Sequence, residues 1–401
     1  MEENMTQQLD STKIRNYNPV MAYRRFGKTE TPISVITLGG MRYVHGWEDP
    51  RDQIPADMID NCRECVELAL KHGINHIETA HGYVKSEHCY GIVLHKELSL
   101  KRDSYYLMTK GAPEDATETR RLIEEQLKAL GVDYFDHYAW HGINNQEIFE
   151  KSCGKGGPVE ELLKIKEEGI IKAVGFSTHS QRDIIEKTIE TDLFDFVNLH
   201  YYYFFQRNER AVQKAAQRDM GVFIISPNEK GGHLFNPSPL MKELTAPLTP
   251  SQFNGRFCLK TPQVQTLSFG MSSPYHFKQM ASVVPDGDDH WNEQDEEILN
   301  RMDKRKELDV YRSFDGYSIF DDPSGINIPE ILRYRQMWKY FGNAAFPEMR
   351  YNMFEEKGNW FPGRYATEEN LAKIDMSKVP EWVPLKDLLH EVHQRFYKKK
   401  D

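Results

Sequence analysis

The sequence predicts an α/β protein built on a closed, parallel (β/α)8 barrel, followed by a mainly helical C-terminal extension. Between residues 21 and 285, eight short apolar segments alternate with amphipathic segments, the pattern of a parallel sheet with crossover helices. No Gly-x-Gly-x-x-Gly follows an early strand, which disfavours the competing open, doubly wound sheet. Polar residues able to do chemistry lie at the ends of successive strands, where barrel enzymes place their active sites.

The eight predicted strands are short and rich in β-branched and aromatic residues. They cover residues 33–38, 74–79, 105–109, 135–140, 171–176, 194–199, 222–225 and 264–269. The helices predicted between them cover residues 56–71, 117–130, 158–168, 181–188 and 209–219, and several end at a Gly that suits a helix C-terminus. Residues 23–28, before the first strand, are predicted to form a short hairpin that plugs the barrel floor.

Composition limits the classes of protein to consider. The net charge of -10 argues against binding to nucleic acid or to anionic membranes. No apolar run approaches the roughly 20 residues that span a bilayer, and residues 1–19 are polar, without a signal region. Five scattered cysteines suit a reducing compartment, so we expect a cytoplasmic protein. We divide it into a mobile tail (1–20), a barrel (21–285) and an extension (290–401).

Two pairs of potential metal ligands each have a structural alternative. Cys62 and Cys65 fit a redox or metal pair, but they recur with Val66 and Ala69 at helical spacing, which favours a core-facing stripe. His137 and His141 share a strand face. Because no carboxylate or Cys lies at matching spacing, we favour an interior role for His137 over a metal site.

Four residues at neighbouring strand ends suit reduction of a carbonyl. Tyr83 and Glu78 follow the second strand, Lys110 ends the third and His141 ends the fourth. A Tyr hydroxyl, with an ordinary pKa near 10, is a poor acid at neutral pH. A buried Lys eases its proton release, a carboxylate holds the Lys, and a His orients the carbonyl.

The segment 76–87, His-Ile-Glu-Thr-Ala-His-Gly-Tyr-Val-Lys-Ser-Glu, resembles the second-strand signature of aldo-keto reductases, Asp-Thr-Ala-x-x-Tyr-Gly-x-Ser-Glu. Residues 131–136 resemble the family's run before strand four. The resemblance implies a catalytic tetrad of Tyr83, Lys110, His141 and Glu78. Glu78 replaces the family's Asp, so its extra methylene must be absorbed by the backbone or by Lys110.

The same resemblance implies a bound nicotinamide cofactor, NADP or NAD. Ser177 and Thr178 match the Ser-Asn pair after strand five that holds the carboxamide, and Asn198 stands for the family's Gln on strand six. Two further segments are similar to phosphate-binding turns, although a plain tight turn is the alternative for residues 225–232. Their implied cofactor residues are Ser226, Gly231, Gly270, Met271 and Ser272. Met271 and Phe277 stand where many relatives carry Lys or Arg for a 2′-phosphate, which leaves NAD possible.

The extension resembles the ferredoxin-like domain that one branch of the family carries. Residues 323–332 and 382–392 match its framework, yet no cysteine follows Cys258, and Asp322 precedes Pro323 where a cluster ligand is expected. Iron–sulfur clusters need Cys thiolates. We therefore expect a degenerate, helical version of the domain with no iron–sulfur cluster.

The leading functional hypothesis is an NAD(P)-dependent oxidoreductase that reduces a carbonyl, or oxidises the alcohol, of a small polar molecule such as a sugar. A redox-neutral elimination or epimerisation with tightly bound NAD(P) is one alternative, suggested by Glu78, Thr178 and Asn198. A cofactor-binding sensor or scaffold is the other. We expect a small-molecule partner and neither nucleic acid nor a membrane, and an oligomer is compatible with the sequence.

Overall fold

The computed structural model describes residues 9–43, 46–230, 232–319, 322–353 and 362–398, and they form two compact units. The first unit comprises Met1–Asn228 and Asn254–Trp291, and the second comprises Glu229–Phe253 and Asn292–Asp401. The sequence places residues 229–253 in the barrel. The structure instead groups this segment with the C-terminal helices, because its contacts are long-range and leave no local sequence signal.

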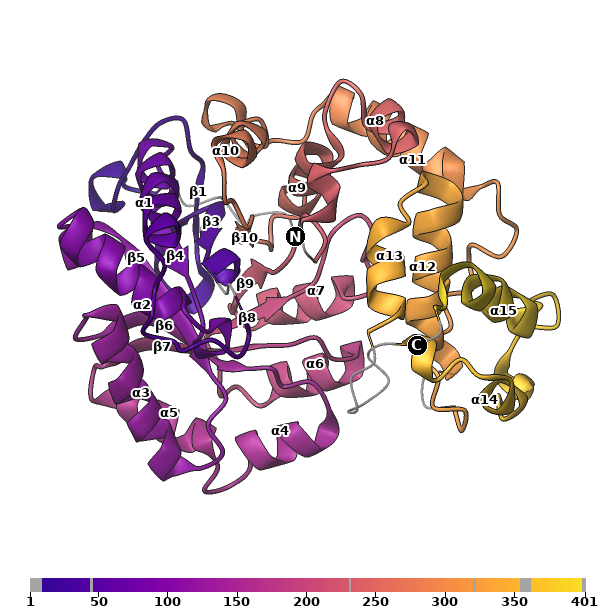
Figure 1. The fold of residues 1–401 in the computed structure, drawn as a ribbon, viewed down its shortest axis with the longest axis horizontal. Coiled ribbons are helices and arrows are strands. Elements are labelled where there is room, and N and C mark those ends of the chain that lie inside the picture. Colours follow the sequence, from indigo (N-terminus) through magenta and orange to yellow (C-terminus); the bar gives the residue numbers. More distant parts are fainter. Residues whose placement is uncertain (1–8, 44–45, 231, 320–321, 354–361, 399–401) are drawn as a thin grey trace. The chain divides into compact units, whose positions relative to one another are not determined.

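The first unit is a closed barrel of eight parallel strands, as predicted (Figure 1). The strands are β3 (Ile36–Gly39), β4 (His76–Glu78), β5 (Tyr106–Gly111), β6 (Phe135–His141), β7 (Ile171–Ser177), β8 (Phe196–Leu199), β9 (Gly221–Ile224) and β10 (Thr266–Ser268). The barrel closes where β10 pairs with β3. The predicted first strand is divided in two, since its first half belongs to a separate hairpin.

That hairpin forms the barrel floor. Strand β1 (Tyr23–Arg25) pairs antiparallel with β2 (Pro32–Ser34), and the turn between them carries Phe26 into the interior. Phe26 is fully buried, with its ring 5.2 Å from that of His137 and 5.4 Å from that of Phe196. The predicted plug is therefore confirmed.

Helices form the outer layer of the barrel unit (Figure 1). Helix α1 (Ala56–Lys71) has the predicted bounds, and it buries Cys62, Cys65, Val66 and Ala69, which confirms the core-facing stripe. The other helices of this layer are α2 (Ser86–Gly91), α3 (Ala116–Leu130), α4 (Gln146–Cys153), α5 (Pro158–Glu167), α6 (Arg182–Glu190), α7 (Glu209–Gln217) and α10 (Pro274–Ala281).

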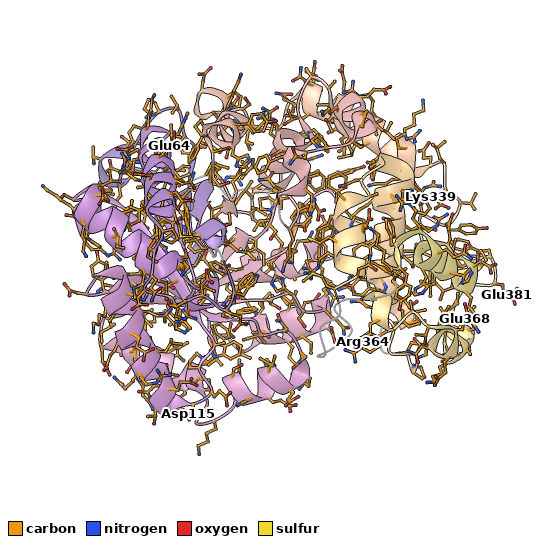
Figure 2. The ribbon with its side chains drawn as sticks, viewed as in Figure 1. Glu64, Asp115, Lys339, Arg364, Glu368 and Glu381 are labelled. Atoms are coloured by element: carbon orange, nitrogen blue, oxygen red, sulfur yellow. The ribbon has the colours of Figure 1, made fainter. Side chains whose placement is uncertain are left out.

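Charged side chains cover the outer faces of these helices. Glu64 on α1 and Asp115, whose side chain caps the start of α3, are exposed and are labelled in Figure 2. Among the described residues, no helix is both long and apolar enough to cross a membrane.

The strand register brings the carboxyl ends of β4 to β8 to one level. Glu78 pairs with Met108 and, two residues further along β5, Lys110 pairs with Ala139. His141 pairs with Ser177, which pairs with Asn198. Because side chains alternate along a strand, the inward-facing set includes the predicted catalytic residues.

His137 lies lower in the barrel, on the floor. Its Nε2 is 3.3 Å from Thr31 Oγ1, and burial lowers the pKa of His137 to about 4. The imidazole is therefore neutral at physiological pH and packs in the interior, as expected from the sequence.

The N-terminal segment differs from the expected mobile tail over its described part. Arg15 donates to the Tyr105 carbonyl at 2.7 Å and to Asp136 at 2.9 Å. Asn16 donates to the carbonyls of Leu70 and Ile74. From Arg15 onward the segment is thus held against the barrel, by partners some 50 to 120 positions away that a local composition signal cannot reveal.

The second unit is helical. Its helices are α8 (Pro239–Thr245), α11 (Glu293–Lys306), α12 (Ile328–Phe341), α13 (Ala345–Tyr351), α14 (Glu368–Ala372) and α15 (Leu385–Phe396), and α9 (Pro250–Leu259) spans the division between units. Its core includes Ile328, Ile331 and Leu389. Asp322, at the expected cluster position, accepts hydrogen bonds from the amides of Ser324 at 2.8 Å and Asp375 at 2.5 Å. It serves as a turn residue.

Candidate active site

A buried ion pair lies at the centre of the barrel mouth. Glu78 ends β4 and Lys110 lies near the end of β5, and both are almost fully buried. Lys110 Nζ donates to Glu78 Oε1 and, at 2.8 Å, to the carbonyl of Thr79. Burial lowers the pKa of Lys110 well below its usual value, and the adjacent carboxylate opposes that shift.

Tyr83 extends this pair toward solvent. It lies in a short 3-10 turn, His81–Tyr83, after β4, and its hydroxyl donates to Glu78 Oε1 at 3.3 Å. Lys110 Nζ lies 4.8 Å from the centre of the Tyr83 ring. Burial raises the pKa of Tyr83 above its ordinary value, so the hydroxyl is protonated at neutral pH.

His141 completes the predicted set of four. It ends β6, and its ring lies 5.8 Å from the Tyr83 ring, perpendicular to it. The structure therefore brings together all four residues predicted to be catalytic.

Gly39 explains how a Glu fits where relatives have an Asp. It pairs with Glu78 across β3 and β4. A Cβ at Gly39 would lie 2.5 Å from Ser268 Oγ and 3.2 Å from Glu78 Oε2. The extra methylene of Glu78 is thus accommodated by a missing side chain on the neighbouring strand. Ser268, which the sequence reading missed, donates to Glu78 Oε2 at 3.3 Å.

A second buried carboxylate supports the turn that carries Tyr83. Glu87 Oε1 accepts from Thr109 Oγ1 and from Gln126 Nε2, both at 2.6 Å. Its Oε2 lies 3.6 Å from His81 Nδ1. Glu87 belongs to the signature segment, so its position was available from the sequence, but its partners were not.

The backbone after Tyr83 is strained. Val84 has φ 46° and ψ -92°, a conformation that is rare for a β-branched residue. Such strain is of order 1–3 kcal/mol and persists only where the surroundings enforce it. Here it lies directly beside the candidate proton donor.

Three residues predicted to hold the carboxamide lie at the ends of β7 and β8. Asn198 is fully buried, and its Oδ1 has no hydrogen-bond partner among the described residues. Ser177 Oγ accepts from the Gly142 amide at 3.1 Å, which leaves its hydroxyl proton available. Thr178 is engaged, because its hydroxyl donates to the Ile143 carbonyl at 2.7 Å.

The predicted phosphate-binding residues lie in two turns. Ser226 follows β9 with φ 54°, and Gly231 lies outside the described residues. Gly270 has φ 66°, Met271 is fully buried, and the Ser272 amide donates to His276 Nδ1 at 3.1 Å. Gly270 and Ser272 lie in the turn before α10, whereas Met271 is a core residue.

A histidine pair at the same end of the barrel was not anticipated. His179 Nδ1 lies 2.7 Å from His200 Nε2. Each lies two positions after a predicted cofactor residue, His179 after Ser177 and His200 after Asn198, just beyond the ends of β7 and β8. The position of each histidine two residues after a predicted cofactor residue could have identified the pair from the sequence.

Comparison with known proteins identifies the family of this barrel. The family model described as "Aldo/keto reductase family" matches residues 35–234. The chain belongs to the aldo/keto reductase family. The match covers the strands that carry Glu78, Lys110, His141 and Asn198, so the candidate site lies within the family region.

Among curated aldo/keto reductase relatives, "Methylglyoxal reductase DkgA" from Escherichia coli (strain K12) is 29% identical over 138 residues, which are 34% of this chain and 48% of that protein. The chain thus spans about half the length of the curated relative it matches. Two solved structures share the fold. The holo form of an aldo-keto reductase from Bacillus halodurans has a TM-score of 0.57 at 18% identity, covering 70% of this chain and 96% of that one. An aldo-keto reductase from Klebsiella pneumoniae, in complex with NADPH, has a TM-score of 0.52 at 20% identity, covering 66% and 89%.

Proposed function

We propose that this protein is an NAD(P)-dependent oxidoreductase that interconverts a carbonyl and an alcohol in a small polar substrate such as a sugar. The observation that carries the proposal is the convergence of Tyr83, Glu78, Lys110 and His141 at one end of the barrel. Membership of the aldo/keto reductase family agrees with this chemistry, and so does the name of a relative, a methylglyoxal reductase.

Tyr83 is the proton donor and acceptor in this proposal. Tyr83 is half-buried, whereas Glu78 and Lys110 behind it are shielded from water, so Tyr83 is the member of the set that a substrate oxygen can reach. In a site of low dielectric, the Lys110 cation stabilises negative charge on the phenol oxygen. His141, beside the tyrosine ring, is placed to donate a hydrogen bond that orients the substrate oxygen.

The residues near β7, β8 and β10 fit a nicotinamide dinucleotide. Asn198 Oδ1, which has no partner in the described part of the chain, is an acceptor for a carboxamide N–H, and Ser177 supplies a hydroxyl donor. The turn that contains Gly270 and Ser272 leads directly into α10, and the N-terminus of that helix suits phosphate oxygens. When bound, the nicotinamide ring supplies or accepts the hydride. Met271 and Phe277 are buried and carry no charge for a 2′-phosphate, which supports NAD over NADP.

Replacement of the tyrosine tests the proposal. We expect Tyr83→Phe to lower turnover of an aldehyde and ketone panel, measured as NADH or NADPH consumption, by about 10²–10⁴-fold, the range of a lost general acid. Tyr17→Phe, an exposed tyrosine, is the matched control and should behave as wild type. Unchanged activity in Tyr83→Phe contradicts the assignment, and cofactor binding with no turnover of any substrate favours a sensor or scaffold.

A redox-neutral elimination or epimerisation is a second candidate, supported by one observation. The His179–His200 pair provides a further acid–base centre at the same end of the barrel, which a single hydride transfer does not need. This candidate predicts that cofactor purifies with the protein and that product forms from a sugar substrate with no net change in the absorbance of reduced nicotinamide.

A further inference from the structure

We propose that Glu78 takes the proton of Tyr83 directly, so that the resting site is set for alcohol oxidation through a relay from substrate hydroxyl to Tyr83 to Glu78. The inference rests on the proposed function, because it concerns the same tyrosine. It goes further by giving Glu78 a role other than holding Lys110, and by naming the protonation state in which each direction of the reaction starts.

The direction of one hydrogen bond carries the inference. Tyr83 Oη lies 3.3 Å from Glu78 Oε1, and an ionised carboxylate can only accept. Tyr83 therefore donates its proton toward Glu78, and the lone pairs of its oxygen remain for a donor on the substrate side. Among the described residues, Lys110 makes no hydrogen bond to Tyr83 Oη; its ammonium lies over the ring instead.

The length of the Glu78 side chain makes this contact possible. The carboxylate spans three groups at once, with Oε1 meeting Lys110 and Tyr83 and Oε2 accepting from Ser268. Gly39 leaves the room that this longer side chain needs. An Asp at this position is one carbon shorter, so we expect it to lose the contact with Tyr83 while it keeps the lysine.

The proton and electron balance of oxidation follows. The substrate C–H bond breaks and its electron pair leaves as hydride to an oxidised nicotinamide dinucleotide. The substrate O–H proton passes to Tyr83 Oη as the Tyr83 proton passes to Glu78 Oε1, and a carbonyl remains. After the carbonyl leaves, the proton returns from Glu78 through the half-buried Tyr83 to solvent, so one alcohol gives one carbonyl, one reduced nicotinamide and one proton. Reduction runs the same path backward and starts from protonated Glu78.

The titratable groups that face Glu78 come from three elements. Lys110 on β5 is in direct contact, Tyr83 lies in the turn after β4, and His141 on β6 lies beside the tyrosine ring. Ser268 on β10 and Gly39 on β3 add no charge. The Lys110 cation opposes protonation of Glu78, so the proton that Glu78 takes is shared with the lysine and the ionisation belongs to the Glu78–Lys110 pair.

The first test needs neither cofactor nor turnover. We label tyrosines with ¹³C at Cζ, assign Tyr83 by its missing resonance in Tyr83→Phe, and follow its shift with pH in cofactor-free protein. In wild type, the resonance is expected to move as the Glu78–Lys110 pair titrates. In Glu78→Asp and in the isosteric Glu78→Gln, that step is expected to disappear, whereas a purely structural role of Glu78 leaves it in place in Glu78→Asp.

The second test is the pH profile of alcohol oxidation. A substitution leaves the equilibrium between alcohol and carbonyl unchanged, so kcat/KM must fall equally in both directions at a given pH. The shape of the plot of kcat/KM against pH is therefore what distinguishes the relay. For Glu78→Asp we expect a loss of about 10²-fold near neutral pH, with the rate still rising into the alkaline range where Tyr83 itself ionises. Persistence of the NMR step and of the wild-type profile in Glu78→Asp overturns the relay, and inactivity of Tyr83→Phe alongside that result leaves the proposed function standing.

Discussion

At the scale of single residues, the site depends on a pairing of one large side chain with one missing side chain. Glu78 is longer than the Asp that the family signature carries, and Gly39 opposite it has none. The two positions therefore act together, and we expect a substitution at either Glu78 or Gly39 alone to disturb the site. Ser268 belongs to the same arrangement, because its hydroxyl occupies the space nearest to Gly39.

Adding one methyl group to Gly39 tests this pairing. In Gly39→Ala the new Cβ would meet Ser268 Oγ at 2.5 Å and Glu78 Oε2 at 3.2 Å, so the carboxylate must shift from Tyr83. A misplacement of about 1 Å at a reacting centre can cost about 10²-fold, and the shift here is smaller, so we expect kcat to fall by less than that with little change in secondary structure. Steady-state kinetics and circular dichroism measure both.

The double variant Gly39→Ala with Ser268→Ala is the matched control for that prediction. It removes the closer of the two clashes and leaves only the contact with Glu78. Partial recovery of kcat supports the steric explanation. Equal loss in the single and double variants points instead to the backbone of β3.

At the scale of elements, the turn that holds Tyr83 is anchored by a buried polar network. Glu87 on α2 accepts from Thr109 on β5 and from Gln126 on α3, and Gln126 accepts from Tyr138 on β6. Four elements thus fix a turn that also contains the strained Val84. A network of this kind over-determines the backbone, which is what strained residues at functional sites require.

Replacing Glu87 by Gln keeps the shape and removes the charge. The hydrogen bonds to ionised groups are stronger than neutral ones, so Glu87→Gln is expected to lower the free energy of unfolding by about 1–3 kcal/mol. We also expect kcat to fall because the Tyr83 turn loosens. Denaturant unfolding and kinetics check the two effects, with Glu114→Gln, an exposed carboxylate, as the control. Full activity in a destabilised Glu87→Gln protein contradicts the link to Tyr83.

At the scale of the whole molecule, the chain forms two units with different architectures. The barrel unit carries the candidate site, and the helical unit has its own apolar core and a buried ionic cluster. In that cluster Arg333 lies between Glu229, at 3.3 Å, and Glu330, at 3.1 Å. Glu229 is fully buried, and one of its oxygens has no partner among the described residues.

Stability of the helical unit is expected to depend on the protonation of Glu229. Burial raises the pKa of Glu229 to about 7, Arg333 opposes the shift, and Glu330 adds to it. A raised carboxyl pKa gives stability that is present below its unfolded value near 4.5 and is lost as pH rises through 7. The loss reaches at most about 3 kcal/mol for this group.

The variant Glu229→Gln removes that titration. We expect the unfolding midpoint of the wild type to fall from acidic to alkaline pH across the region near 7, and the midpoint of Glu229→Gln to change less. Thermal unfolding followed at several pH values measures the difference. Parallel profiles for the two proteins show that Glu229 is not the titrating group.

The sequence by itself determined the barrel and predicted the four residues that meet at its mouth. Alternating apolar and amphipathic segments predicted all eight strands, and helix α1 was predicted to the residue, because local periodicity reports which face is buried. Positions at strand ends predicted Tyr83, Lys110 and His141, since parallel strands end together. These signals are short-range and need no knowledge of distant partners.

Only the tertiary structure decided how Glu78 fits, what holds the N-terminal segment and which unit contains residues 229–253. Gly39 and Ser268 are far from Glu78 in sequence and meet it across the closed barrel. Arg15 fixes the N-terminal segment through Asp136, and residues 229–253 join the second unit. The physical reason is common to these cases: contacts between distant segments set side-chain space and hydrogen-bond partners, and they leave no periodic pattern in the sequence.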